Sequence, residues 1–211
     1  MLIGILNRKG GCGKSTTAVH LAYWLSTQNQ RVIVIDSDGQ MSSSQWLKKL
    51  NMPSVIIADP DELFDQIGEL SEKYDSVVVD SPSVLGEPAK SVLLNVDLAI
   101  VPVQPSNLDL LSAKDIVRLV HQAQKIRKGP PKAAMFLSRA SRGTVLMREA
   151  REALKETKGF TLLDSVIYQR QVIADAPGQD ATVFSMPGDA ASSAAKGYSS
   201  LFEEALNYAK T

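Results

Sequence analysis

The chain has 211 residues, and its 23 Lys and Arg side chains balance its 23 Asp and Glu side chains. Hydrophobic and charged fractions of 44% and 22% are ordinary for a soluble globular protein, and the length suits one α/β domain, so we expect a single domain over residues 1–211. The one cysteine, Cys12, excludes an internal disulfide and any zinc site built from several cysteines.

The N-terminus passes directly from Met1 into an apolar run, without the basic region and cleavable apolar segment of a secretory signal. The longest apolar runs are shorter than the roughly 20 residues that cross a bilayer. We therefore expect a cytoplasmic protein.

Short apolar runs alternate with helical patterns along the chain. The runs at 1–6 and 31–36 enclose a helical pattern over 14–28, in which Ala18, Leu21 and Leu25 recur at helical spacing. Further strands are predicted at 54–58, 76–80, 98–103, 133–138 and 162–167, and helices near 61–70, 107–127, 145–157 and 192–208. This alternation predicts a doubly wound α/β fold with a mostly parallel sheet and helices on both faces. Ligands of such sheets bind at the carboxyl ends of the strands, where the polar clusters of this chain fall.

The first predicted strand leads into the glycine-rich sequence NRKGGCGKSTT at 7–17. Glycines permit backbone conformations that turn successive N–H groups toward phosphate oxygens, and the following helix adds its positive N-terminal end. Lys14 is expected to neutralise the β- and γ-phosphates of ATP, Ser15 to hold Mg²⁺, and Thr16 to donate toward the α-phosphate. The predicted nucleotide-binding residues of the loop are Lys9, Gly10, Gly11, Cys12, Gly13, Lys14, Ser15 and Thr16.

Three aspartates end two of the predicted strands. Asp80 closes the run SVVVD, and Asp36 and Asp38 follow the run RVIVI at positions whose side chains point the same way from an extended strand. Magnesium takes oxygen ligands from one or two carboxylates and keeps several waters, so these aspartates are candidates for its site. Any one of them could instead cap the next helix.

The segment from Lys9 to Ser15 resembles the deviant Walker A motif of the ParA/MinD family of ATPases. The sequence DSDGQ at 36–40 resembles that family's Asp-x-Asp-Pro-Gln segment, and VVVDSPS at 77–83 resembles its Walker B strand. The sequence VIYQRQVIADAPGQDATVF at 166–184 resembles its late signature. The similarity spans about the whole chain and implies a P-loop NTPase fold with ATP and Mg²⁺ as cofactors.

The resemblance also implies residue roles. Lys9 is similar to the signature lysine, which reaches across a nucleotide-sandwich dimer to the partner's phosphates, while Lys14 serves its own subunit. Asp38 is expected to position or activate the attacking water, and Asp36 and Asp80 to support the magnesium ion. The catalytic residues implied are thus Lys9, Lys14 and Asp38.

Two departures from the family pattern concern the nucleotide base and the loop rigidity. Gly39 stands where the family commonly has proline, and Ser138 precedes Arg139 where Asn-Arg often contacts adenine. By resemblance, adenine contacts are expected from Arg139, Met186 and Pro187.

Three branches of the family bind different partners. Iron-protein relatives need cysteines to ligate a cluster, and the only cysteine here lies inside the glycine loop. MinD-like members attach to membrane through a basic amphipathic C-terminal helix. The last predicted helix here lacks a cationic face, so we expect it to pack onto the domain and the protein not to bind membrane.

ParA-like members bind double-stranded DNA without sequence preference, through contacts between basic side chains and phosphates. The segment 114–158 carries twelve Lys and Arg against four Asp and Glu, which suits a polyanionic partner but also an ordinary solvated surface. Arg148, Arg151 and Lys155 share one helix face, and Arg170 falls in the late signature. These four are the candidate DNA contacts, although the helix face also fits internal ion pairs.

The ParA-like resemblance implies an ATP-dependent homodimer that associates with the nucleoid and positions a plasmid, a chromosome region or a carboxysome. A cargo adaptor, ParB-like or McdB-like, would stimulate hydrolysis. One alternative is an amidating or ligase-type enzyme of the same superfamily, which Lys9 argues against. Another is a regulatory ATPase that binds only protein.

Overall fold

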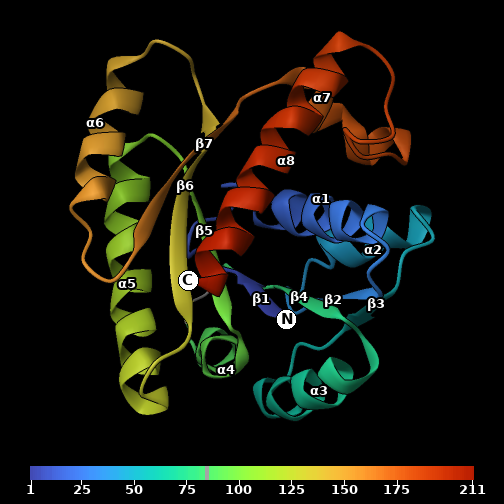
Figure 1. The fold of residues 1–211 in the computed structure, drawn as a ribbon, viewed down its shortest axis with the longest axis vertical. Helices are drawn as coiled ribbons and strands as arrows, with labels where there is room; N and C mark the ends of the chain where they lie inside the picture. Colours follow the sequence, from blue (N-terminus) through green and yellow to red (C-terminus); the bar gives the residue numbers. More distant parts are fainter. Residues whose placement is uncertain (84–85) are drawn as a thin grey trace.

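Seven parallel strands form one sheet in the order β3-β2-β4-β1-β5-β6-β7 (Figure 1). The computed structural model describes residues 1–83 and 86–211, apart from the side chains of 107–112. The strands are β1 Leu2–Ile5, β2 Val32–Asp36, β3 Ser54–Ile56, β4 Ser76–Asp80, β5 Leu98–Val103, β6 Lys132–Ala140 and β7 Thr161–Tyr168. The helices are α1 Lys14–Thr27, α2 Ser42–Lys49, α3 Pro60–Lys73, α4 Glu87–Asn95, α5 Asn107–Arg127, α6 Val145–Lys155, α7 Gln171–Asp175 and α8 Asp189–Lys210, with the 3₁₀ helix η1 at Ala176–Gln179.

Helices cover both faces of the sheet, because successive strand residues point to opposite sides and both sides are apolar. In β4, Val78 packs in the cluster that contains α1, α2 and α8, whereas Val77 and Val79 pack in the cluster that contains α3, α4, α5 and α6. Figure 1 shows these two sets of helices on opposite sides of the sheet. The predicted doubly wound α/β fold is therefore confirmed, and its sheet is parallel throughout the described pairings.

The register of the central strands places the predicted aspartates together. Asp80 at the end of β4 is the register partner of Ile5 in β1 and of Asp36 in β2. Because the glycine loop follows β1 directly, two strand-end carboxylates and the loop meet at one edge of the sheet. Ligand sites of parallel α/β sheets lie at this edge.

The last helix, α8, packs onto the sheet as predicted. Its buried side chains are Ala191, Ala194, Tyr198, Leu201, Phe202 and Ala205. All of these except Ala191 belong to the same core cluster as α1. Within 1–83 and 86–211, no helix combines the length and apolar character needed to span a bilayer.

Candidate functional site

The glycine loop between β1 and α1 has the backbone shape of an anion cradle. Gly11 and Gly13 have φ angles of 76° and 100°, in the left-handed region that side chains disfavour. A Cβ atom on Gly13 would also lie 2.9 Å from Ser138 Oγ. Gly13 is the N-cap of α1 and makes no side-chain cap, so the N–H groups of the first turn remain available to a ligand.

Neighbouring strands hold this loop by hydrogen bonds. Asn7 Nδ2 donates to the Pro102 carbonyl of β5 at 2.7 Å. Ser138 Oγ, in β6, donates to the Cys12 carbonyl at 2.8 Å, and Arg139 Nη1 donates to the Gly11 carbonyl at 2.6 Å. The loop shape is therefore fixed by strands far away in the sequence. Ser138 stabilises the loop backbone directly.

Lys14 lies buried at the centre of the cradle and donates to two protein oxygens. Its Nζ atom is 3.1 Å from the Lys9 carbonyl oxygen and 2.8 Å from Ser83 Oγ. An ammonium held by neutral oxygens can exchange them for a phosphate oxygen, because charge-assisted hydrogen bonds are stronger than bonds to neutral acceptors. The role of Lys14 in binding phosphate stays a prediction.

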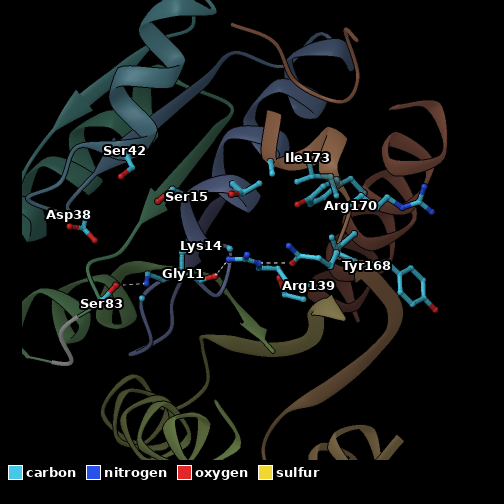
Figure 2. Close-up of a pocket in the computed structure, with 18 of the residues that line it drawn as sticks. Gly11, Lys14, Ser15, Asp38, Ser42, Ser83, Arg139, Tyr168, Arg170 and Ile173 are labelled. Atoms are coloured by element: carbon cyan, nitrogen blue, oxygen red, sulfur yellow. Dashed lines mark hydrogen bonds between the residues drawn. The ribbon is translucent and has the colours of Figure 1, made fainter. Parts of the chain in front are cut away.

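A pocket of about 460 Å³ opens over the loop. Figure 2 shows Asp38, Ser42 and Ser83 on one side of Lys14, and Arg139, Tyr168, Arg170 and Ile173 on the other. The first side is polar, whereas on the second side Ile173 gives an apolar wall beside the cations Arg139 and Arg170. Ile167 and Tyr198 also line the pocket. A ligand with a polyanionic end and a flat apolar end fits this division.

Asp36 makes the contacts of a helix-capping residue. Its two carboxylate oxygens accept hydrogen bonds from Asp38 N at 3.1 Å and Ser44 N at 2.8 Å, and the side chain is fully buried. Ser44 lies in the first turn of α2, so Asp36 satisfies an N–H group that the helix leaves open. Asp36 lies within the candidate magnesium site, but its direct contacts stabilise the start of α2.

Asp80 is in the opposite situation. It is fully buried, and neither carboxylate oxygen has a hydrogen-bond partner among the described residues. Burial raises the pKa of Asp80 to about 7, Asp36 adds to the increase, and Ser15, Ser43 and Lys14 oppose it. The hydroxyls of Ser15 and Ser43 thus lie near enough to lower the pKa of the carboxyl group, yet neither makes a hydrogen bond with it that meets both distance and angle requirements.

A hydrated cation beside Asp80 would explain this arrangement. A buried carboxylate without a partner is unfavourable unless something positive or hydrogen-bonding occupies the space beside it. Mg²⁺ usually keeps several waters and takes one or two protein ligands, so the oxygens of Ser15, Ser43 and Asp80 fit its requirements. In the described part of the chain no three His, Cys, Asp or Glu side chains converge as a metal cluster.

Asp38 lies on the polar side of the pocket. Its Oδ1 atom accepts a hydrogen bond from Gln40 N at 3.0 Å, which closes a tight turn before α2, and its carboxylate lines the pocket. It is half-buried, so solvent reaches it. A carboxylate in this position can accept a proton from a water molecule in the pocket.

Lys9 begins the loop and is half-buried, and among the described residues it does not line the pocket. Its backbone N–H donates to Asn7 Oδ1 at 3.2 Å, and its carbonyl accepts from Lys14. The preceding Arg8 pairs with Asp115 of α5 at 2.6 Å. Cys12 is buried, and its thiol donates to the Lys9 carbonyl, so it packs inside the loop.

The predicted adenine contacts separate in space. Arg139 lines the pocket, where its guanidinium also donates to Gln169 Oε1 at 2.9 Å. Met186 and Pro187 are not among the described residues that line the pocket, and Met186 packs against the core cluster. The reason is local: the turn before Met186 folds back through Met186 N to the Thr182 carbonyl at 3.1 Å. The position of Met186 and Pro187 gives no support to a contact with the base.

The predicted DNA contacts on α6 are not equivalent. Arg148 and Lys155 are exposed, whereas Arg151 forms an ion pair and hydrogen bond with Asp164 of β7 and its side chain is only 26% exposed. Two exposed cations therefore remain on this helix face. Arg170 lies apart from them and lines the pocket.

His20, in the second turn of α1, is a buried neutral histidine behind the pocket. Its Nδ1 atom donates to the Thr16 carbonyl at 2.7 Å, and its Nε2 atom accepts from Val183 N at 3.2 Å, which fixes the tautomer. Its ring stacks on Tyr198, with centroids 4.5 Å apart, and meets Trp46 edge to face. Burial lowers the pKa of His20 to about 4, although the bond to Thr16 opposes the decrease.

The His20 environment predicts a loss of stability in acid. The folded-state pKa of about 4 lies below the ordinary 6.5, so the stabilisation is complete above pH 6.5 and lost as the pH falls through 4. The loss is about 3 kcal/mol. Urea unfolding of wild type and His20→Asn at pH 7 and at pH 4 measures this loss. The free energy of unfolding of wild type minus that of the variant should be smaller at pH 4 than at pH 7 by that amount. A constant difference would contradict the prediction.

Several residues of the pocket escaped prediction from sequence. These are Gln40, Ser42, Ser83, Ile167, Tyr168, Gln169, Ile173, Ala174 and Tyr198. Ser83 alone had a usable signal, since it follows Asp80 by three residues in the sequence DSPS. The others are common residue types that only the fold brings to this edge.

Comparison with known proteins agrees with this geometry. Residues 3–183 match the family described as the CobQ/CobB/MinD/ParA nucleotide binding domain. The maintenance of carboxysome distribution protein A of Halothiobacillus neapolitanus is 27% identical over 191 residues, which are 87% of each chain. The protein of the same name from Gloeobacter kilaueensis is 34% identical over 127 residues, which are 58% of this chain and 56% of the relative.

Solved structures share the fold at low sequence identity. Apo McdA from Cyanothece has a TM-score of 0.77 at 19% identity, covering 97% of this chain and 98% of that chain. A putative plasmid partition protein from Borrelia burgdorferi bound to AMPPNP has a TM-score of 0.76 at 20% identity, covering 98% of each. Cobyrinic acid a,c-diamide synthase from Mycobacterium smegmatis, with an ATP analogue and magnesium, has a TM-score of 0.74 at 18% identity, covering 100% and 95%. These likenesses establish a P-loop NTPase fold and do not distinguish among the activities of these proteins.

Proposed function

The chain belongs to the CobQ/CobB/MinD/ParA family of nucleotide-binding domains, and from this membership we propose that it is a ParA-like ATPase that positions a cargo on the nucleoid. With ATP and Mg²⁺ it forms a homodimer, and the dimer binds double-stranded DNA without sequence preference. An adaptor protein stimulates hydrolysis and releases it. The observation that carries the proposal is the second lysine, Lys9, at the start of a loop whose Lys14 lies in the pocket.

ATP is proposed to lie with its phosphates over the glycine loop and its base toward the apolar wall. Lys14 and the first-turn N–H groups of α1 would bind the phosphates. The magnesium ion would be held by Ser15 and Asp80, and it supplies positive charge that offsets the charge of the phosphates. The ligands named in the structures from Borrelia burgdorferi and Mycobacterium smegmatis, AMPPNP and an ATP analogue with magnesium, support this assignment.

Hydrolysis in this proposal depends on positioning. Asp38 would accept a proton from the attacking water or orient it, from its place on the polar side of the pocket. Asp36 would act indirectly, because its carboxylate holds the N–H groups of Asp38 and Ser44 and so fixes the turn that carries Asp38. Residues 1–211 are proposed to form one domain that contains all of these parts.

Dimerisation would bring the loops of two subunits face to face. Two polyphosphates at close range repel, and an ammonium from the opposite subunit lowers that repulsion. We propose that Lys9 gives this charge to the opposite subunit. Among the described residues it does not line the pocket of its own subunit. Lys14 remains with its own subunit.

DNA binding is proposed to use the exposed cations of 114–158, among them Arg148 and Lys155. A dimer carries twice as many such cations as a monomer, and each phosphate contact adds to both affinity and salt dependence. ATP would therefore switch DNA binding by switching dimerisation. The positive charge of Arg170 and Arg151 would contribute less, because one lines the pocket and the other pairs with Asp164.

The cargo is proposed to be a carboxysome, a plasmid or a chromosome region. The relative from Halothiobacillus neapolitanus, named for carboxysome distribution and matched over 87% of both chains, favours the carboxysome and a McdB-like adaptor over a ParB-like one. The protein would then be cytoplasmic and associated with the nucleoid. A regulatory ATPase that binds only protein predicts no DNA binding in any nucleotide state.

An amidating enzyme is the second candidate, because the diamide synthase from Mycobacterium smegmatis has nearly the same TM-score as McdA. Such an enzyme needs a site for a small carboxylate beside the γ-phosphate. Lys9 has no evident role in that chemistry, which favours the dimeric ATPase.

We expect DNA binding to depend on ATP and on Lys9. Wild type should bind nonspecific duplex DNA at least tenfold more tightly with ATP than with ADP or no nucleotide, and this gain should fall as salt rises. Lys9→Ala should still bind ATP, but it should no longer form the dimer and should no longer bind DNA more tightly with ATP. Fluorescence anisotropy with a labelled duplex measures the DNA affinity, and light scattering measures the mass of the protein and so its oligomeric state.

The neighbouring residue gives the control. Arg8→Ala removes a charge one position away, from a pair with Asp115 that is well exposed, and should leave dimerisation and DNA binding intact. DNA binding that is independent of nucleotide, or absent throughout, would refute the nucleoid proposal. Equal effects of Lys9→Ala and Arg8→Ala would show that only the loop charge matters.

A further inference from the structure

Ser83 lies in the pocket at a place that none of the roles above uses. It follows β4 and faces the glycine loop, so that a Cβ atom on Gly10 would lie 3.9 Å from its hydroxyl oxygen. That oxygen accepts a hydrogen bond from Lys14 Nζ at 2.8 Å. Among the described residues its own O–H has no acceptor.

The bond to Ser83 occupies the lysine that is proposed to bind phosphate. Lys14 also donates to the Lys9 carbonyl at 3.1 Å, so two of its three N–H donors are directed to protein oxygens at the mouth of the cradle. A phosphate that accepts a hydrogen bond from Lys14 is expected to replace at least one of these two protein oxygens as its acceptor. Ser83, which lies against the ammonium, is then close to the phosphate as well.

The side of the pocket indicates which phosphate this is. Ser83 and Asp38 lie on the polar side of Lys14, opposite the apolar wall at Ile173 (Figure 2). With the base toward that wall and the inner phosphates over the start of α1, the terminal phosphate of a triphosphate is the one nearest Ser83. A diphosphate leaves this position empty.

We propose that Ser83 positions the terminal phosphate of a nucleoside triphosphate and so distinguishes ATP from ADP. In the resting site its oxygen accepts from Lys14. With a triphosphate bound its O–H donates to a γ-phosphate oxygen, which only accepts, while Lys14 binds the same phosphate. The inference rests on the proposed function, because it requires that a nucleotide binds over the glycine loop.

Ser42 gives a matched control. It lines the same side of the same pocket at the start of α2, but no contact with Lys14 ties it to the cradle. Removing its hydroxyl deletes the same atom from the same pocket wall. Ser83→Thr serves as the conservative variant, since it keeps the hydroxyl.

The test compares triphosphate and diphosphate affinity. Isothermal titration with AMPPNP and with ADP, both with Mg²⁺, is made on wild type, Ser83→Ala, Ser83→Thr and Ser42→Ala. Ser83→Ala should weaken AMPPNP binding about tenfold, as the loss of a hydrogen bond to a charged group does. ADP binding should stay unchanged or tighten, because Lys14 has lost one resting partner. Ser83→Thr should keep much of the wild-type preference, and Ser42→Ala all of it.

Each other outcome has a definite meaning. If Ser83→Ala loses affinity equally for AMPPNP and ADP, or if its melting temperature falls together with both affinities, Ser83 holds the loop and the inference is overturned. An unchanged ratio in Ser83→Ala would overturn it too. If wild type binds neither nucleotide, the proposed function itself fails, which is a different result from an altered ratio.

Discussion

Asp38→Ala is expected to reduce ATP turnover about a hundredfold or more while ATP binding and dimerisation persist. The carboxylate lies on the polar side of the pocket, and loss of a group that activates or orients the attacking nucleophile has effects of this size. Binding should persist, because in the proposed site Lys14 and the first turn of α1 bind the phosphates without Asp38. Phosphate release under saturating ATP measures turnover, and titration with AMPPNP measures binding.

Asp38→Asn separates chemistry from turn geometry. Asparagine keeps an oxygen for the Gln40 N–H and forms the same type of turn. It cannot take a proton from water. We expect it to be as inactive as Asp38→Ala, and normal turnover in Asp38→Asn would show that Asp38 does not act as a base.

Asp80→Asn is expected to stabilise the nucleotide-free protein while abolishing its response to magnesium. Burial raises the pKa of Asp80 from 3.8 to about 7, so its contribution to stability is present below pH 3.8 and lost as the pH rises through 7. Above pH 7 the ionised carboxylate lowers the free energy of unfolding by about 4 kcal/mol. The neutral amide should restore that amount at pH 8, and less at pH 5. Urea unfolding at the two pH values measures it.

Asp36→Asn is the matched control, because Asp36 is buried in the same site. Both of its oxygens accept backbone N–H groups, and an amide NH₂ would face one of those donors. Asp36→Asn should therefore destabilise the protein by about 1 to 2 kcal/mol. If Asp80→Asn and Asp36→Asn changed the free energy of unfolding in the same direction, the different roles of the two carboxylates would be contradicted. Since His20 titrates in the opposite sense to Asp80, each variant must be compared with wild type at the same pH.

The sheet and the centre of the site were predictable from the sequence. The strands are buried on both faces and read as uninterrupted apolar runs, as in β4 and β5 at 76–80 and 98–103. In a parallel sheet the ends of adjacent strands meet, so the glycine loop, Asp36 and Asp80 had to converge. The spacing of Lys14 and Ser15 after the glycines specified their places in the loop.

Helix α2 was not predicted, because its stability comes from tertiary contacts. Its sequence begins with three serines, which favour caps and turns over helix interiors. The Asp36 carboxylate caps it, and Trp46 Nε1 donates to the Ala181 carbonyl at 2.9 Å. Helix α4 was also not predicted, since its nine residues carry only a few apolar side chains, and these are buried by the fold: Ala89, Val92 and Leu93.

The residues of the pocket wall opposite Asp38 were unpredictable for a different reason. Gln169, Tyr168 and Ile173 are ordinary in composition, and only the path of β7 and α7 brings them beside the loop. The expected contacts from Met186 and Pro187 rested on resemblance, and nothing in their sequence fixes which way the preceding turn folds. The bond from Val183 N to His20 ties this turn to α1.

The bonds that shape the glycine loop also bear on when the protein acquires its site. Ser138 and Arg139 are 126 and 128 residues from the loop carbonyls that they hold. The loop leaves the ribosome early, but its carbonyls find these partners only after β6 has joined the sheet. Long-range contacts of this kind form late. Competence to bind a ligand at the loop would therefore appear only near the end of folding, so that an incomplete chain does not act as a functional subunit.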